Sequence, residues 1–301
     1  MPLLSVIVPT RDRVKRLPNA IDSLRHQTMR DLEVIVVDDG STDGTEALLD
    51  ELEASDGRIR TLRLAGGSGA AVARNAGLAA AVGPFIAFLD DDDTWMPTKA
   101  EEQINYLTDH ADTGLVSCDF MVFDGKREVV HRGPHSFKPG TLLWANLLMG
   151  CSFVMLRRSA FTFEIEFDQA VVPAEDWDLW VRCANERKVA TLPSVLCTYA
   201  RHGAQLTGSS ERIHRGDSGF LAKHGSRMSR YARAYHDAHL RMVKAVGILA
   251  RLRTRISIVR DTPPAVVSLM GKLAVSGRVG ELVGDPGRPF RTLARGADRL
   301  E

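Results

Sequence analysis

The segment EVIVVDDGSTDGT, from Glu33 to Thr45, joins a run of strand-forming residues to two aspartates and a turn that contains glycine. A second segment of this kind, FIAFLDDDD, runs from Phe85 to Asp93 and ends in four aspartates. Nearly continuous apolar runs of this length are typical of parallel strands that are covered on both faces of a sheet. Each segment therefore predicts a buried strand with carboxylates directly after its end.

Two more apolar runs, over 3–8 and 59–64, extend this pattern toward the N-terminus and between the two segments. Stretches rich in alanine, leucine and charged residues separate the runs and are long enough for crossover helices; they span 14–27, 45–54 and 70–81. This alternation predicts an α/β fold with a wound, mostly parallel sheet. Ligands of such sheets bind outside the carboxyl ends of the strands, so the residues after each strand are the candidates for a site.

The chain changes character twice after these strands. Beyond residue 110 we expect mixed elements, with strands over 114–123, 153–156 and 189–199 and helices over 141–149 and 176–186. A break over 203–216, rich in glycine, serine and charge, precedes a mostly helical stretch that begins near residue 219. We therefore predict one catalytic domain over 1–210 and a basic, mostly helical C-terminal extension over 211–301.

Charge is distributed unevenly between these two regions. Residues 1–210 carry 21 lysines and arginines against 30 acidic residues, whereas residues 211–301 carry 18 against 8. Within the basic region, apolar residues recur every three or four positions over 239–259, which predicts an amphipathic helix. This helix could lie on an anionic membrane, or pack on the catalytic body or on a second subunit as a homodimer. Nucleic-acid binding is not expected, because no aromatic interleaving or known module accompanies the basic residues.

Composition excludes several classes of protein. A hydrophobic content of 44% with 26% charged residues is ordinary for globular chains and argues against disorder or a collagen-like repeat. The four cysteines form no CxxC pair, so neither a zinc site nor a redox motif is predicted, and a reducing cytoplasm is the simplest location. The longest uncharged window, 139–156, is interrupted by proline and glycine and is short for a membrane span. No basic leader precedes the first strand, so we expect a cytoplasmic protein, with peripheral contact at the inner face of the membrane as an option.

The aspartates at 90–93 require an explanation beyond fold stability, because crowded carboxylates repel one another unless a cation or hydrogen-bond donors neutralise them. A divalent metal shared with substrate phosphates would do so. The alternative is a cap on a helix expected near 95–106, but one aspartate suffices for a cap. The same reasoning assigns Asp43 to the cap of the helix that follows it and leaves Asp39 for a ligand.

Six motifs in order give the sequence a resemblance to the inverting glycosyltransferases of family 2. They are SVIVPT at 5–10, QT at 27–28, EVIVVDDGSTDGT at 33–45, ARNAG at 73–77, FLDDDD at 88–93 and EDWDLW at 175–180. The resemblance covers roughly residues 3–207. It implies a GT-A fold, which is a Rossmann-like nucleotide-diphospho-sugar transferase fold, with a donor-binding half over about 1–110 and an acceptor-facing half over about 111–210. It also implies a nucleotide-sugar donor and a divalent metal, Mn²⁺ or Mg²⁺.

The resemblance also implies roles for individual residues on the donor side. Pro9, Thr10 and Arg13 should flank the nucleotide, while Asp39 should accept a hydrogen bond from its base, most often uracil in this family. The carboxylates expected to contact ribose or sugar hydroxyls are Asp90 and Asp91. Asp92 should reach the metal, and Asp93 is either a further member of this set or a cap for the following helix.

Four more residues complete the predicted site. Arg74 could pair with the aspartate run or with the donor phosphate, although it could also be a surface arginine. Asp176 is the candidate general base that takes the proton of the acceptor hydroxyl, with Glu175 as its substitute or support; an acidic first helical turn is the alternative. On a late loop, His202 is a candidate metal or phosphate ligand, unless it is simply exposed.

The predicted function is transfer of a sugar from a nucleotide-diphospho-sugar, most often a UDP-sugar, to an acceptor hydroxyl by metal-assisted single displacement with inversion. The acceptor would belong to a polysaccharide, glycolipid or other glycoconjugate. One alternative is a nucleotidyltransferase that forms nucleotide sugars, but the stretch PTRDR at 9–13 lacks the glycine-rich loop expected there. A non-catalytic nucleotide- or sugar-binding module is the other alternative, and the intact acidic motifs argue against it.

Overall fold

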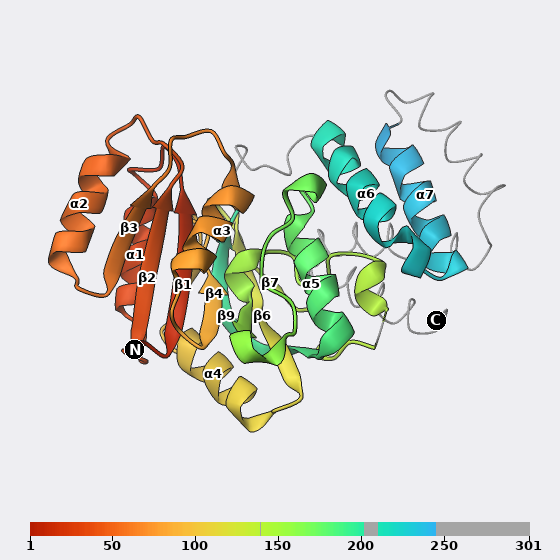
Figure 1. Cartoon of the computed structure of the whole chain (residues 1–301), viewed down its shortest axis with the longest axis horizontal. Helices are drawn as coiled ribbons and strands as arrows, with labels where there is room; N and C mark the ends of the chain where they lie inside the picture. The colour runs from red at the N-terminus through yellow and green to blue at the C-terminus, as the bar shows by residue number, and fades with distance from the viewer. Residues whose placement is uncertain (139, 202–209, 245–301) are drawn as a thin grey trace.

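The computed structural model describes residues 1–138, 140–201 and 210–244. Its centre is a mixed sheet with the strand order β3-β2-β1-β4-β8-β6-β9-β5, and β7 pairs with β6 outside this path (Figure 1). The strands are β1 Leu4–Thr10, β2 Leu32–Asp38, β3 Ile59–Arg63, β4 Phe85–Phe88, β5 Thr94–Trp95, β6 Thr113–Phe123, β7 Glu128–His131, β8 Met155–Arg157 and β9 Lys188–Ala200.

The four N-terminal strands are parallel, as the sequence predicts. Strand β1 lies between β2 and β4, and its last residue, Thr10, stands opposite Asp38 at the end of β2. Strand β8 then runs antiparallel to both β4 and β6, and β9 continues the sheet parallel to β6. The predicted α/β class with a mostly parallel wound sheet is confirmed.

Side chains that alternate along β1 enter two different cores. Ile7 packs in one cluster with residues of helices α3 (Ala70–Ala80) and α5 (Glu175–Glu186). Val6 and Val8 pack in another cluster, which includes residues of α1 (Leu17–Arg25), α2 (Thr45–Ser55) and α4 (Lys99–Asp109). Because both faces of β1 are covered, every residue of this strand is buried, and this explains its nearly continuous apolar sequence.

Three sequence predictions differ from the structure in the middle of the chain. The helix expected over 141–149 is only a 3-10 turn, Thr141–Leu143, because the apolar residues of this stretch are buried on several sides instead of along one helical face. The strand expected over 153–156 is shifted to β8, and a second 3-10 turn occupies Cys151–Phe153. The helix expected near 95–106 begins only at Lys99, because Thr94 and Trp95 pair with β9.

The described part of the C-terminal region consists of helices α6 (Ser210–His224) and α7 (Arg230–Lys244), joined through the 3-10 turn Gly225–Arg227. The pair lies beside α5, on the side away from β2 and β3 (Figure 1). Most of the amphipathic helix predicted over 239–259 lies outside the described residues, and the domain boundary predicted at 210 stays a prediction. None of the helices in 1–138, 140–201 and 210–244 has the length and apolar character needed to cross a bilayer.

Candidate active site

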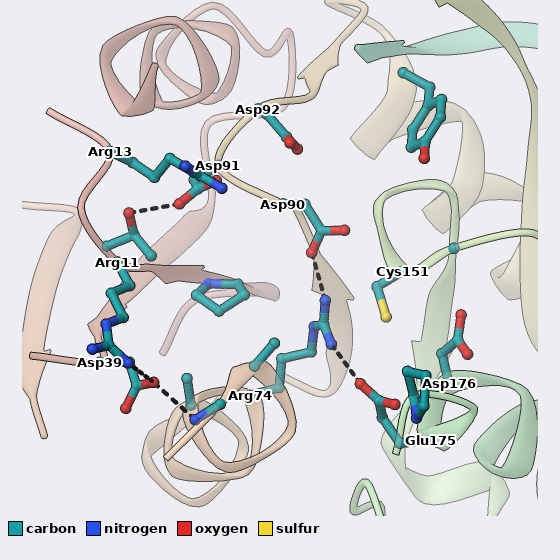
Figure 2. A pocket seen from close by; sticks show the side chains of 18 of the residues that line it. Arg11, Arg13, Asp39, Arg74, Asp90, Asp91, Asp92, Cys151, Glu175 and Asp176 are labelled. Carbon is teal, nitrogen blue, oxygen red and sulfur yellow. Dashed lines mark hydrogen bonds and ion pairs between the residues drawn. The ribbon is translucent and has the colours of Figure 1, made fainter. Parts of the chain in front are cut away.

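A cavity of about 440 Å³ opens at the carboxyl ends of β1, β2 and β4 and extends to the first turn of α5 (Figure 2). Ten of the residues predicted from the sequence line it. They are Pro9, Thr10, Arg13, Asp39, Arg74, Asp90, Asp91, Asp92, Glu175 and Asp176. The eleventh, His202, lies outside the described residues.

Asp91 is fixed by the end of β1. Its carboxylate accepts a hydrogen bond of 2.7 Å from the Thr10 hydroxyl, and the Arg13 guanidinium lies 3.5 Å away. Burial raises the pKa of Asp91 to about 7, against the lowering effect of the Thr10 hydrogen bond, and the adjacent Asp92 raises it further. A carboxyl group with a strongly perturbed pKa that lines a cavity is a candidate for contact with a ligand.

Asp39 follows β2 directly and lines the same cavity. Its two carboxylate oxygens accept hydrogen bonds from the backbone N–H groups of Ser68 and Gly69, at 2.9 and 2.8 Å. Each oxygen keeps a second lone pair, so the carboxylate can still accept from a nucleobase. The cap predicted at Asp43 is displaced by one residue: the N-cap of α2 is Gly44, and Asp43, directly before it, accepts from the backbone N–H of Thr45.

The loop over 66–69, whose backbone binds Asp39, can come close to the turn after β2 because a glycine stands on each side of the contact. Gly40 has a φ of +74°, and a Cβ atom there would lie 2.4 Å from the Cα of Gly66. No side chain fits at that separation, so Gly40 is required by both its conformation and its neighbour. The stretch over 66–69 is therefore a strand-to-helix connection beside Asp39.

Arg74 joins the two sides of the cavity, as Figure 2 shows. One guanidinium nitrogen lies 2.7 Å from Asp90 Oδ1 and another lies 3.5 Å from Glu175 Oε1. The side chain is buried and packs 5.4 Å from the ring centre of Phe167. The alternative of a surface arginine is therefore wrong.

Asp176 lies in the first turn of α5 and lines the cavity. Its Oδ2 accepts a hydrogen bond of 3.0 Å from Asn146 Nδ2, and its Oδ1 accepts one of 2.6 Å from the backbone N–H of Trp177. Burial, followed by repulsion from Glu175, raises the pKa of Asp176 to about 7. A carboxylate with this pKa can accept a proton near neutral pH, which is what a general base must do.

The described residues offer one carboxylate, that of Asp92, for the metal site predicted from the sequence. Asp92 lines the cavity beside Asp90 and Asp91, although the described ranges contain no group of three or more His, Cys, Asp and Glu placed to hold a metal. Magnesium and similar ions commonly take one or two carboxylates and complete their coordination with substrate phosphates and water. Asp92 is thus able to serve as a carboxylate ligand of an ion that arrives with the donor.

Asp93 does not belong to this set. It is buried and accepts a hydrogen bond of 3.0 Å from the backbone N–H of Ala200, at the end of β9. It also cannot cap α4, which begins at Lys99. Asp93 therefore ties β9 to the loop after β4, and both roles considered for it from the sequence are wrong.

Several cavity residues are missed by sequence reasoning. Arg11 lies 3.9 Å from Asp39, while Tyr199 and Cys151 also line the cavity. Burial raises the pKa of Cys151 well above its usual value, so the thiol stays protonated and is not a nucleophile at neutral pH. Asn146, which is not among the lining residues but donates to Asp176, is missed because the sequence predicts a helix without site residues in its segment.

Comparison with known proteins finds matches both in sequence and in structure. The family described as Glycosyl transferase family 2 matches residues 5–163. TuaG of Bacillus subtilis, to which a glycosyltransferase role in teichuronic acid biosynthesis is provisionally assigned, is 36% identical over 52% of this chain, which spans 63% of that relative. WfgD of Escherichia coli, named as a UDP-Glc:α-D-GlcNAc-diphosphoundecaprenol β-1,3-glucosyltransferase, is 32% identical, and the match covers 63% of this chain and 73% of that relative.

Two solved structures show the same fold at low sequence identity. Residues 1–349 of Staphylococcus aureus TarS, in complex with UDP-GlcNAc, superpose with a TM-score of 0.65 at 17% identity and cover 100% of this chain and 93% of that one. The mannosyltransferase PcManGT of Pyrobaculum calidifontis, in complex with GDP-Man and Mn²⁺, gives a TM-score of 0.61 at 18% identity, covering 99% and 86%. The predicted GT-A fold is confirmed by these likenesses.

Proposed function

The chain belongs to glycosyl transferase family 2, and on this premise we propose that it transfers a sugar from a UDP-sugar to a hydroxyl group of a cell-envelope polysaccharide or glycolipid precursor. The observation that carries the proposal is one cavity in which Asp39, Asp91 and Asp92 face Asp176 across Arg74. The names of TuaG and WfgD support an envelope acceptor, and those of WfgD and the TarS complex support a UDP-linked donor.

The nucleotide is assigned to the side of the cavity formed by β1 and β2. Asp39 accepts from the base, while Thr10 and Arg13 stand beside the nucleoside and keep Asp91 in place for hydroxyl contacts. Pro9 forms part of the wall next to them. The donor diphosphate then lies toward Asp92, whose carboxylate, with His202 as a second candidate ligand, would hold Mn²⁺ or Mg²⁺. When bound, such an ion supplies positive charge that stabilises the departing diphosphate.

Asp176 is proposed to take the proton of the acceptor hydroxyl as that oxygen attacks the anomeric carbon from the face opposite the leaving group. Asn146 and the backbone N–H of Trp177 hold its carboxylate in one orientation. Because the pKa of Asp176 is about 7, the carboxylate is both largely ionised above neutrality and basic enough to accept a proton. One displacement inverts the anomeric configuration and needs no covalent intermediate.

Arg74 is proposed to keep Asp90 and Glu175 at a fixed separation and to contribute positive charge near the leaving group. Removing one preorganised stabilising group of this kind typically costs about 3 kcal/mol of transition-state stabilisation. Its burial against Phe167 limits the motion of the guanidinium. This role connects the donor side to Glu175, the neighbour of the proposed base.

A screen of donors tests the function directly. The protein is incubated with Mn²⁺ and separate UDP-, GDP- and TDP-sugars, and the release of nucleoside diphosphate is recorded, with Asp176→Asn as the inactive control. We expect release from a UDP-sugar, and faster release when glycolipid acceptors that carry a free sugar hydroxyl are added. Absence of release from every donor, with and without acceptors, would contradict the proposal.

A peripheral position at the inner face of the membrane is also proposed, because the acceptor named for WfgD carries a lipid and residues 211–301 are strongly basic. Flotation with liposomes that contain anionic lipid tests this point. We expect co-flotation at low salt that is lost as salt is raised, and no co-flotation at any salt concentration would refute it.

A further inference from the structure

Helix α6 turns one continuous face toward the segment that carries Asp176. The residues of this face recur at helical spacing, at positions 216, 219, 220, 223 and 224. A Cβ atom at Gly216 would lie 3.1 Å from Pro173 Cδ, and one at Gly219 would lie 3.5 Å from Val171 Cα. The two glycines thus let the backbone of α6 approach the turn that leads directly into Glu175 and Asp176.

The next residue of this face packs against the neighbour of the proposed base. Phe220 is fully buried, and its ring stacks on that of Trp177 with a centroid separation of 3.6 Å and an interplanar angle of 13°. The backbone N–H of Trp177 donates to Asp176 Oδ1. The position of Trp177 therefore determines the direction of one of the two hydrogen bonds that orient Asp176.

The last two residues of the face hold a carboxylate in the same helical turn of α5. Asp178 is completely buried, and its Oδ1 lies 2.7 Å from His224 Nε2 and 2.8 Å from Lys223 Nζ. Arg182 Nε binds the other oxygen at 3.0 Å. Burial alone would raise the pKa of Asp178, but the hydrogen bonds from His224 and Lys223 lower it to about 2. The carboxylate is therefore ionised at neutral pH and firmly tied to α6.

Helix α7 positions the segment that carries Asn146, the second hydrogen-bond donor to Asp176. His236 is buried, and its Nε2 donates a hydrogen bond of 2.7 Å to the carbonyl oxygen of Leu143. The indole N–H of Trp177 donates one of 2.6 Å to the carbonyl oxygen of Leu142. These contacts position the segment that begins with the 3-10 turn Thr141–Leu143 and continues to Asn146, the side chain that donates to Asp176 Oδ2.

We propose that helices α6 and α7 hold the first turn of α5 and the segment over 141–146 in place, and that His224 and Lys223, acting through Asp178, are positioning residues for the Asp176 carboxylate. These helices follow the segment matched by the family, 5–163, and no comparison assigns them a role. The inference rests on the proposed function of Asp176 as the base. Because a misplacement of about 1 Å at a reacting group can slow a reaction about a hundredfold, such bracing affects turnover without any contact to substrate.

The groups proposed to bind the donor do not depend on α6 and α7 for their positions. Among the described residues, the contacts of α6 and α7 given above all go to the segments around 142–143 and 171–178, whereas Thr10, Asp39 and Asp91 are held by β1, β2 and the loop over 66–69. A defect in the bracing should therefore lower kcat and leave the affinity for nucleotide unchanged. A general loss of folding would change both.

The test compares three histidine variants of the full chain. In His224→Ala the hydrogen bond to Asp178 is lost, and we expect kcat to fall about tenfold or more while the Kd of UDP with Mn²⁺ stays within about twofold. In His224→Gln the amide N–H can replace the imidazole donor, so kcat should recover to within about threefold of the wild type. His239→Ala is the matched control, because the pair that His239 forms with Asp217 at 3.2 Å joins α7 to α6 and not α6 to α5.

Hydrogen–deuterium exchange supplies a readout that does not depend on activity. We expect faster exchange over 175–182 in His224→Ala but not in His239→Ala, and unchanged exchange in β1 and β2. Unaltered kcat in His224→Ala, a parallel loss of kcat and UDP affinity, no recovery in His224→Gln, or unaltered exchange over 175–182 would each overturn the proposal. If the wild type releases no nucleoside diphosphate but His224→Ala still exchanges faster than the wild type over 175–182, the proposed function is refuted and the bracing of α5 by α6 is supported.

Discussion

The side of the cavity proposed for the donor and the side proposed for the acceptor are built in different ways. On the donor side, parallel strands deliver Thr10, Asp39 and Asp91 to one edge, and the backbone itself joins the strand ends through the hydrogen bond from Asp39 N–H to the carbonyl of Thr10. On the acceptor side, Asp176 depends on Asn146, thirty residues earlier, and its helix is held by side chains of α6. Strand register thus places the donor groups, whereas long-range side-chain contacts place the proposed base.

The largest effect expected from this difference is a separation of chemistry from binding. Asp176→Asn removes the proton acceptor and keeps the shape of the side chain, so kcat should fall about a thousandfold. UDP affinity should not change, because the donor groups are held by the sheet. Single-turnover release of nucleoside diphosphate measures the first quantity, and retention of more than about a tenth of the wild-type rate would remove Asp176 from its role.

A smaller effect, a fall of about a hundredfold in turnover, is expected when Arg74, which connects the two sides of the cavity, is replaced. Arg74→Lys keeps the charge but cannot contact Asp90 and Glu175 at the same time with the geometry of a guanidinium. Both kcat and UDP affinity should fall, unlike the result for Asp176→Asn. Steady-state kinetics and calorimetry check this, and a variant with wild-type kinetics would show that the connection between the sides is not needed.

Substitution of two glycines tests whether the backbone positions the groups proposed to bind the donor. Gly40→Ala should weaken UDP binding about tenfold or more, because its Cβ would collide with Gly66 in the loop that holds Asp39. Gly44 also has a positive φ, of +93°, but has open space around it, so Gly44→Ala should cost only about 1 kcal/mol of stability and leave UDP affinity intact. Equal affinities in the two variants would contradict the proposed role of the loop contact.

Side-chain control of the acceptor side should be visible in the pH dependence. The proposed base must be ionised, so kcat/KM should fall as pH drops below about 7, the pKa to which burial and Glu175 raise Asp176. The hydrogen bond from Asn146 favours the ionised form, so Asn146→Ala should move this pKa upward, by less than about one unit. A pH–rate profile of both proteins measures the shift, and a downward shift would be inconsistent with the observed contact.

The same difference explains how far the sequence could predict the structure. Thr10, Asp39 and the aspartates after β4 were predictable because apolar strands and the residues that follow them are contiguous in sequence. Asn146 was not, since its segment packs on several sides and forms only a short 3-10 turn. Asp93 shows the opposite error, because a run of four aspartates does not reveal that one of them turns inward to bind Ala200.

The roles of residues in α6 were equally hidden from sequence analysis. His224 and Lys223 look like basic residues at the end of a charged helix, and their partner Asp178 looks like part of an acidic first turn. The packing of Phe220 on Trp177 and the close approach of Gly216 and Gly219 to the turn before α5 bring these charges together. Pairing between helices that are distant in sequence is a tertiary property, and no local pattern encodes it.

We propose that Asp92, with a divalent ion, would hold the donor diphosphate on one side of the cavity while Asp176 acts on the acceptor from the other. Titration calorimetry of UDP in the presence of Mn²⁺, with the wild type, Asp92→Asn and Asp176→Asn, tests it most directly. We predict markedly weaker binding for Asp92→Asn alone. Equal affinity in all three proteins, or a loss confined to Asp176→Asn, would contradict the claim.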